Sequence, residues 1–142
     1  TSELAYERSG PERFLSSFRV FVELVRICGD SPSPHQAAAI GRIASHFMTL
    51  RRMSLSVAGM LEAGKDVSVE AALVKELGNN FEKLLPEIAR LVVPDLSAVD
   101  PDKQRLFRET FEETLMLSPS FTLRGGTREI MRGVIARGLG LR

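Results

Sequence analysis

The chain has 142 residues, of which 44% are hydrophobic and 26% charged, and its formal net charge is +1. This length suits one domain with a sizeable core. The near-neutral charge provides no basic field for nucleic acid or an anionic membrane. The single cysteine, Cys28, excludes an internal disulfide and suits a reducing compartment, so we expect a cytoplasmic protein. We find neither a transmembrane stretch nor a signal peptide, and the start at Thr1 without a methionine predicts a piece of a longer protein.

The first half of the chain predicts two long helices. Steps of three and four residues return to the same side of a helix, and they give the first helix an apolar face of Phe14, Phe18, Phe21 and Val25. A turn at residues 29–34 separates it from the second helix, residues 34–63. The apolar stripe of that second helix consists of Ile40, Ile43, Phe47, Leu50, Val57 and Leu61.

The second half predicts three more helices. Ser68 is the expected N-cap of a third helix that Pro86 kinks, and its apolar stripe consists of Leu73, Leu77, Phe81, Leu84, Ile88 and Leu91. An Asp100-Pro101 start signal opens a fourth helix that runs to about Leu115, and the last helix covers residues 127–137. No segment alternates with period two, so we expect an all-α fold, an up-and-down bundle of four helices with a short C-terminal fifth.

Metal and phosphate sites have little support in the sequence. His35 and His46 are eleven residues apart and lack further ligands at a recognised spacing, so both are expected to be surface or locally hydrogen-bonded histidines. No phosphate-binding glycine loop of a known pattern is present. The Gly125-Gly126 pair precedes the last helix, where backbone N–H groups favour anions, although such a pair is usually only a turn.

Glu7 is the candidate catalytic carboxylate near the start of the chain. Pro11 follows it by four residues and cannot donate a helical hydrogen bond to the Glu7 carbonyl, so Ser9-Gly10-Pro11 marks either a kink or the true start of the first long helix. A carboxylate at such a break can face a cleft, where burial raises the pKa of a carboxyl group. The alternative is an ordinary surface glutamate near a chain terminus.

The segment Ser118–Arg142, with its Gly125-Gly126-Thr127 turn before a short helix, resembles the C-terminal signature of the acyl-CoA dehydrogenases. The stretch Leu4-Ala5-Tyr6-Glu7-Arg8 is similar to a second motif of that family. The resemblance implies that residues 1–142 form the family's C-terminal helical domain. The N-terminal helical domain and the central β-domain would then belong to parts of the protein outside this sequence.

The resemblance also implies a reaction and its residues. In this family a carboxylate removes the α-proton of an acyl-CoA while a hydride passes to FAD, giving a trans-2-enoyl-CoA. Most members carry the base directly before the Gly-Thr pair, where this chain has Gly125, which cannot act as a base. Isovaleryl and long-chain types carry it in the stretch that contains Glu7, so Glu7 is the implied base. Gly126, Thr127 and Glu129 would lie along the flavin, roles compatible with a helix N-cap at Thr127 and a first-turn carboxylate at Glu129.

Two departures from the family pattern bear on partners. Arg26 and Cys28 stand where the family has Arg-x-x-Phe-Gly, and no Gln-x-x-Gly-Gly-x-Gly motif lies between Lys103 and Phe121. In the family both motifs contact a neighbouring subunit's flavin, so these departures indicate that this subunit contributes little to a neighbour's flavin. The resemblance implies a homo- or hetero-tetramer through the helical bundle, with some actinobacterial heterotetramers that act on steroid side-chain thioesters as one candidate class. Electron-transfer flavoprotein or a similar acceptor is the implied redox partner. The alternative is a non-catalytic assembly subunit of the same fold, and under either reading the isolated chain is expected to be inactive and to bind no FAD.

Overall fold

The computed structural model describes residues 2–141, and these form an all-α structure without a strand. Its six α-helices are α1 (Ser2–Ser9), α2 (Phe18–Cys28), α3 (Pro34–Glu62), α4 (Ser68–Val92), α5 (Pro101–Leu117) and α6 (Arg128–Gly138). Three short 3-10 helices join them: η1 (Pro11–Arg13), η2 (Leu96–Ala98) and η3 (Ser118–Thr122). None of the described helices is long and apolar enough to cross a membrane.

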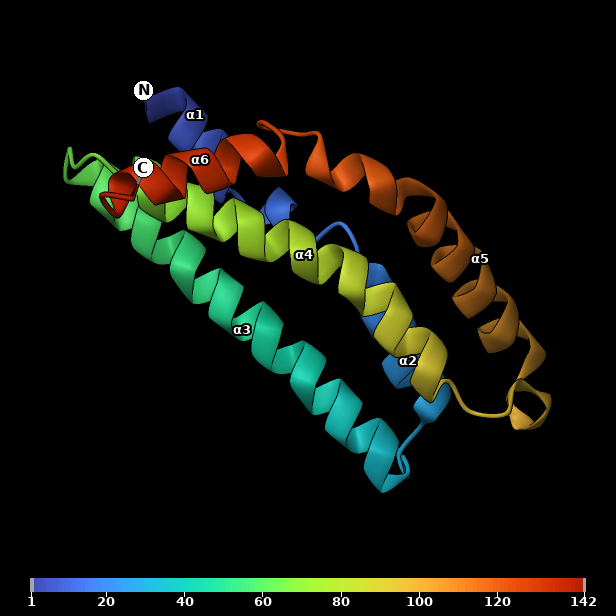
Figure 1. The fold of residues 1–142 in the computed structure, drawn as a ribbon. Helices are drawn as coiled ribbons and strands as arrows, with labels where there is room; N and C mark the ends of the chain where they lie inside the picture. The colour runs from blue at the N-terminus through green and yellow to red at the C-terminus, as the bar shows by residue number, and fades with distance from the viewer. Residues whose placement is uncertain (1, 142) are drawn as a thin grey trace.

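Helix α4 is the centre of the fold and contacts every other α-helix (Figure 1). It packs along α3 on one side, while α1 and α6 lie together at its N-terminal end and α2 and α5 cover its C-terminal half. Small residues let neighbouring helices approach closely, and those buried on α4 are Ala71, Ala72, Gly78 and Ala89. A helix surrounded in this way buries residues on most of its circumference, and α4 does so.

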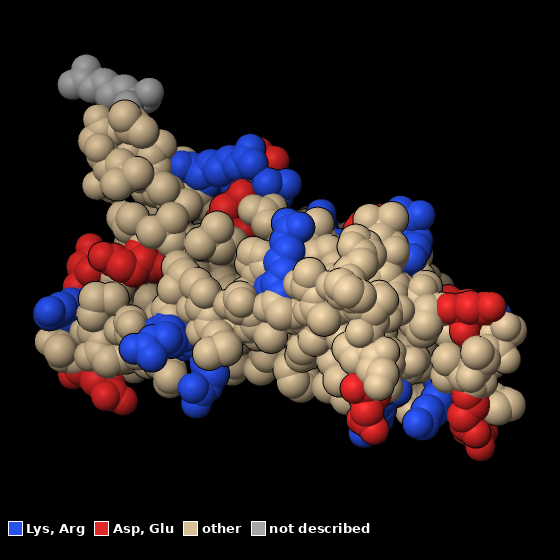
Figure 2. All heavy atoms as spheres, turned by 90° about the horizontal axis from the view of Figure 1, so that it is seen from below, with Lys and Arg blue, Asp and Glu red and all other residues tan. Residues whose placement is uncertain are grey.

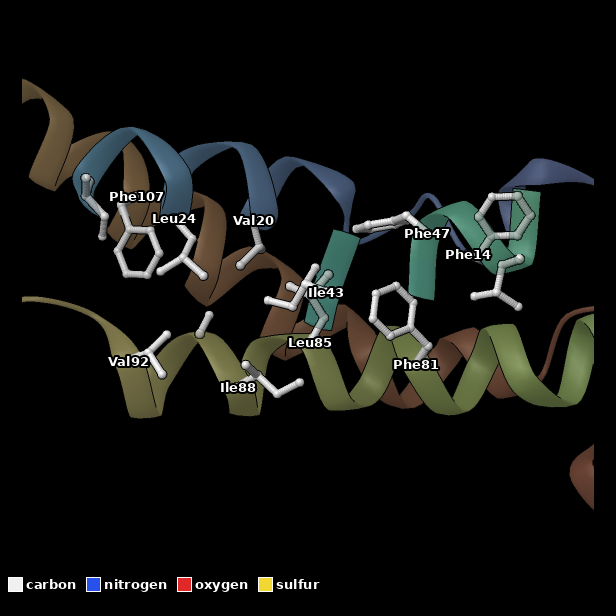
Figure 3. Close-up of a cluster of buried hydrophobic side chains, with 13 residues drawn as sticks. Phe14, Val20, Leu24, Ile43, Phe47, Phe81, Leu85, Ile88, Val92 and Phe107 are labelled. Carbon is white, nitrogen blue, oxygen red and sulfur yellow. The ribbon is translucent and has the colours of Figure 1, made fainter. Parts of the chain in front are cut away.

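The main hydrophobic core lies between α2, α3, α4 and α5 (Figure 3). Phe47 of α3 and Phe81 of α4 meet edge to face with ring centroids 4.8 Å apart, a favoured aromatic geometry. Val20, Leu24 and Leu85 are completely buried beside them. A second, smaller cluster joins α1, α3 and the start of α4 through Ala5, Val57, Val67, Ala71 and Val74.

Charged side chains of both signs are scattered over the face shown in Figure 2. Much of the middle of this face is uncharged, although basic side chains reach it as well, and acidic and basic groups both occur toward the ends. This face therefore carries no single basic field, as the net charge of +1 predicts.

Several predicted element boundaries are confirmed. The second predicted helix is α3, which starts at Pro34 with a capping box between Ser33 and Gln36. Gly64 adopts a left-handed conformation (φ 71°) just beyond its end. The Asp100-Pro101 start of α5 is also confirmed, because the Asp100 carboxylate accepts hydrogen bonds from the first-turn amides of Asp102 and Lys103.

The break predicted at Ser9-Gly10-Pro11 is confirmed, but the extent and the apolar face predicted for the first long helix are wrong. The chain forms the separate helix α1 before Gly10, makes the turn η1 after it and begins α2 only at Phe18, so residues 2–141 form six α-helices rather than five. Pro11 starts η1, which is the position that a proline favours. On α2 the buried positions are Val20, Glu23, Leu24 and Ile27, whereas Phe18 and Val25 of the predicted face are exposed.

The predicted apolar stripe of the third helix is also largely wrong. Phe81 and Ile88 are buried on α4, but Leu77, Leu84 and Leu91 are exposed. Polar residues occupy part of the inward surface instead, because Lys75, Asn79 and Glu82 are completely buried there. The start of α4 differs by one residue: Val67 is the N-cap, and the Ser68 amide and hydroxyl bond to the Asp66 carboxylate.

Candidate functional site

The turn before α6 is a glycine turn that only glycine fits easily. Gly125 and Gly126 have φ values of 68° and 105°, in the left-handed region where a side chain is strained. The Arg8 Nε atom of α1 donates to the Gly125 carbonyl oxygen at 3.1 Å. This contact joins residues 117 positions apart and brings the two ends of the chain together at one site.

The structure brings Glu7 to this turn. A Cβ added at Gly125 would lie 3.3 Å from Glu7 Oε1 and 3.3 Å from the Cε atom of Lys75. The Glu7 carboxylate thus lies directly beside residue 125, the position at which this chain carries no carboxylate of its own. The Glu7 side chain is 44% exposed, so within this chain it is a surface carboxylate and not a buried one.

The buried Arg13 contacts both the backbone and the side chain of Glu7. Arg13 of η1 has a side chain only 5% exposed, and its Nε atom donates to the Glu7 carbonyl oxygen at 2.6 Å. Its Nη2 atom lies 3.6 Å from Glu7 Oε1, within ion-pair range. The carbonyl group of Arg13 packs against Gly78 of α4, where an added Cβ would lie 2.3 Å from the oxygen. The break after α1 thereby serves to place Arg13 between Glu7 and the central helix.

Lys75 of α4 is a buried cation that bonds to the glycine turn. The apolar periodicity of the sequence did not predict that this lysine is buried. Its Nζ atom donates to the carbonyl oxygens of Gly126 and of Thr122, the latter at 3.5 Å. With the Asn79 amide oriented so that its nitrogen donates to the Phe121 carbonyl at 3.2 Å, its oxygen accepts from Lys75 Nζ at 3.1 Å. Burial lowers the pKa of Lys75, with Arg13 as the next cause.

Lys75, Asn79 and Glu82 form a row of buried polar side chains along α4, here called the polar ladder, in which Glu82 lies one turn beyond Asn79. Its Oε1 atom accepts from the Ser16 amide at 2.8 Å, and its Oε2 atom accepts from Arg124 Nη2 at 3.2 Å. Burial raises the pKa of Glu82, although the bonds from Ser16 and the charge of Arg124 oppose this effect. Positions 75, 79 and 82 are spaced four and three residues apart, so one strip of α4 carries a lysine, an amide and a carboxylate in turn. That spacing beside Ala71, Ala72 and Gly78 was the only signal in the sequence that could have found the ladder.

The raised pKa of Glu82 predicts a pH-dependent stability difference. Because the folded-state pKa lies above the unfolded value, the contribution of Glu82 is fully present below the unfolded pKa and is lost as the pH rises through the folded one. We therefore expect Glu82→Gln to gain stability relative to the unsubstituted chain as the pH rises above the ordinary pKa of a glutamate. Urea unfolding at several pH values measures this, with the exposed Glu113→Gln as control. A difference that stays constant with pH would contradict the expectation.

Thr127 and Glu129 lie at the start of α6. Thr127 is the N-cap residue, with extended backbone angles (φ −71°, ψ 167°), but its side chain makes no capping hydrogen bond. Glu129 is exposed in the first helical turn, where its own backbone amide first and the Thr127 hydroxyl second lower the pKa of its carboxyl group. The N-cap and first-turn positions expected for these two residues are therefore both observed.

His35 and His46 lie in different surroundings in the structure. No group of three or more potential ligands is found in residues 2–141. His46 stacks on Phe81 with ring centroids 4.9 Å apart, and His35 is exposed at the start of α3.

Arg26 and Cys28, which depart from the family motif, lie at the end of α2. Arg26 forms an ion pair with the buried Glu23 at 2.7 Å. Burial raises the pKa of the half-buried Cys28 thiol.

Two apolar hollows lie away from the turn. One of about 450 Å³ is bounded by residues 11–18 and by Phe47–Leu55 of α3. The other, of about 350 Å³, lies between α3 and the start of α4 beside Met53 and Leu73. Neither is lined by Glu7 or by Gly125, so neither can present an apolar ligand to the Glu7 carboxylate.

Comparison with known proteins supplies no relative. No family model matches the chain, and no curated protein or solved structure matches it either.

Proposed function

We propose that this chain is the C-terminal helical domain of a flavin-dependent acyl-CoA dehydrogenase in which Glu7 is the catalytic base. The observation that carries the proposal is the position of the Glu7 carboxylate, whose Oε1 atom lies 3.3 Å from the place of a Cβ at Gly125. Two motifs at opposite ends of the chain resemble those that carry the alternative base positions of this family. Their meeting at one turn is an arrangement that the proposed reaction needs.

The fold agrees with the proposal at the level of helices. The long helices α2, α3, α4 and α5 would be the up-and-down bundle of the family's C-terminal domain, and α6 its short final helix. The β-domain and the N-terminal helical domain would be parts of the complete protein. They would supply the acyl cavity, because neither of the hollows described above reaches Glu7.

Each residue of the site has a stated task under this proposal. Glu7 would accept the α-proton of the acyl-CoA, and Arg13 would hold its backbone and carboxylate in place. FAD, when bound, supplies the hydride acceptor. Gly125 and Gly126 leave the turn without side chains, which fits a cofactor ring at this edge. The Thr127 hydroxyl does not cap α6 but bonds to the Glu129 carboxylate, and both side chains would be polar contacts of the flavin. The exposure of Glu7 requires substrate and the neighbouring domain to exclude water from it.

The test is Glu7→Gln in the complete protein, with octanoyl-CoA as the first substrate and an artificial electron acceptor. We expect turnover to fall on the order of 10²–10⁴-fold, the usual contribution of a general base, while the bound flavin keeps its absorbance. Glu3→Gln is the matched control, because Glu3 is also an exposed glutamate of α1 and should leave turnover unchanged. Normal turnover of Glu7→Gln would refute the assignment of the base.

A non-catalytic assembly subunit is the second candidate, and one observation favours it. Leu77, Leu84 and Leu91 point outward from the central helix α4, which is unusual for a row of leucines at helical spacing. Such a row would serve a subunit interface in a homo- or hetero-tetramer. In that case the complete protein would be colourless both alone and with its partner subunit, and sedimentation would show an oligomer that Leu84→Glu dissociates.

A further inference from the structure

Lys75 and Asn79 of the central helix bond to backbone carbonyl groups of the loop from Phe121 to Gly126, and Glu82 of the same helix pairs with the Arg124 side chain of that loop. Lys75 donates to the carbonyl oxygens of Thr122 and Gly126, and Asn79 bonds to that of Phe121. Including the Asn79 oxygen, the ammonium group has three acceptors for its three N–H bonds. Two of the three acceptors of this completely buried lysine are backbone carbonyl groups of one loop, so Lys75 helps to fix the path of that loop.

The partners of Lys75 are unusual because none of them is a carboxylate. Arg8, Arg13 and Arg124 face it with positive charge, and Glu76 opposes them. Glu76 itself is engaged by Arg128 and Arg132 of α6, at 3.2 and 3.3 Å. A methionine of similar length would fill the same space without the charge and would avoid the cost of burying it. The positive charge of Lys75 therefore contributes to the structure through its hydrogen bonds to the turn.

The turn that Lys75 holds is the surface against which Glu7 lies. The Cε atom of Lys75 and the Oε1 atom of Glu7 both lie 3.3 Å from the place of a Cβ at Gly125, on the same side of the turn. Arg8, the residue after Glu7, takes the Gly125 carbonyl, and Lys75 takes the Gly126 carbonyl that follows. Two successive carbonyl groups of the turn are thus fixed by two cations, one from α1 and one from α4.

We infer that Lys75 is a positioning residue of the proposed active site. By holding the Gly125-Gly126 turn, it fixes the surface against which the Glu7 carboxylate lies, and so the position of that carboxylate relative to the reacting carbon of the substrate. The functional meaning of this inference rests on the proposed dehydrogenase, but the bonds themselves require no cofactor. The inference can therefore be tested on the chain without flavin.

The first measurement uses the unsubstituted 142-residue chain. Nitrogen-detected NMR of lysine side chains should show one ammonium group, that of Lys75, protected from solvent and coupled through hydrogen bonds to the Thr122 and Gly126 carbonyl carbons. A Lys75 signal that exchanges as fast as that of the exposed Lys65 would refute the inference. This measurement needs no variant, so it decides the matter even where a substitution prevents folding.

The second measurement compares Lys75→Met with Lys83→Met, a lysine two turns further along α4 and outside the site. We expect amide exchange at Leu123 and Met131, whose N–H groups bond to Ser120 and Thr127 on either side of the turn, to accelerate about tenfold or more in Lys75→Met alone. Exchange at Leu85, in the middle of α4, should stay unchanged. Equal exchange rates in both variants at the turn, or an equal acceleration throughout α4, would show that Lys75 only contributes to general stability.

The complete protein supplies the functional readout. With octanoyl-CoA, Lys75→Met should lower kcat on the order of tenfold to a hundredfold with little change in KM and with flavin still bound, because the carboxylate is displaced but the substrate site is not. An unchanged kcat would overturn the positioning role. If the unsubstituted protein does not turn over any acyl-CoA, the proposed function fails, while the NMR and exchange results still decide whether Lys75 fixes the turn.

Discussion

Gly78→Ala is expected to lower the free energy of unfolding by about 3 kcal/mol, at the upper end of the usual cost of overpacking. The added Cβ would lie 2.3 Å from the Arg13 carbonyl oxygen and 3.1 Å from its carbon. Because both atoms are backbone, no side chain can rotate away, and η1 must move off α4. That movement would also displace Arg13 from Glu7, so the substitution should disturb the site as well as the fold. Urea unfolding followed by circular dichroism measures the loss.

Gly59→Ala is the matched control for this prediction. Gly59 lies within α3, is exposed, and has no atom within 4 Å of an added Cβ. Alanine at an exposed helix interior position usually stabilises by about 0.5–1 kcal/mol relative to glycine. The two substitutions should therefore differ in sign. A stabilising effect of Gly78→Ala would mean that η1 does not pack against α4 as the structure has it.

Leu85→Ala is expected to cost about 2–5 kcal/mol, the range for truncation of a fully buried leucine. Leu85 is completely buried in the main core between α2, α3 and α4 (Figure 3). The loss combines the transfer of three carbon atoms with the cavity that rigid helices leave behind. Urea unfolding should show a lower midpoint with an unchanged slope, since the same surface becomes exposed on unfolding.

Leu91→Ala, on the same helix, distinguishes burial from mere hydrophobicity. Leu91 is 71% exposed, so its truncation should change the free energy of unfolding by no more than about 0.5 kcal/mol. A loss as large as that of Leu85→Ala, growing with protein concentration, would show that another molecule covers Leu91. That result would support the assembly role of the outward leucines on α4.

The apolar periodicity predicted helices well but chose the wrong face twice. On α4 the leucines at positions 77, 84 and 91 satisfied a helical stripe, yet the inward surface carries Ala71, Ala72 and Gly78. A central helix needs small residues where its neighbours approach most closely, and larger side chains such as Leu85 fit only where the core between the helices is wider. Periodicity alone weighs leucine above alanine, so it could not identify the side of α4 that the other helices cover.

The candidate site was predicted in part. The motifs drew attention to Glu7 and to the Gly125-Gly126 turn, and the structure brings these two together across the whole length of the chain. Arg13 and Lys75, which hold them, were not predicted. A charged residue in a helix is usually solvated, so nothing in its own sequence position distinguishes Lys75 from Lys83, which is only partly buried.

Local residues alone determined the all-helical class, the limits of α3 and α5 and the glycine turn, because caps, prolines and glycines act within a few residues of themselves. Only the tertiary structure decided which faces are buried, that α1 separates from α2, and that Glu7, Lys75 and Gly125 share one site. Those features depend on contacts between residues as many as 117 positions apart. Such contacts are made by packing around α4, and no pattern within a single helix encodes them.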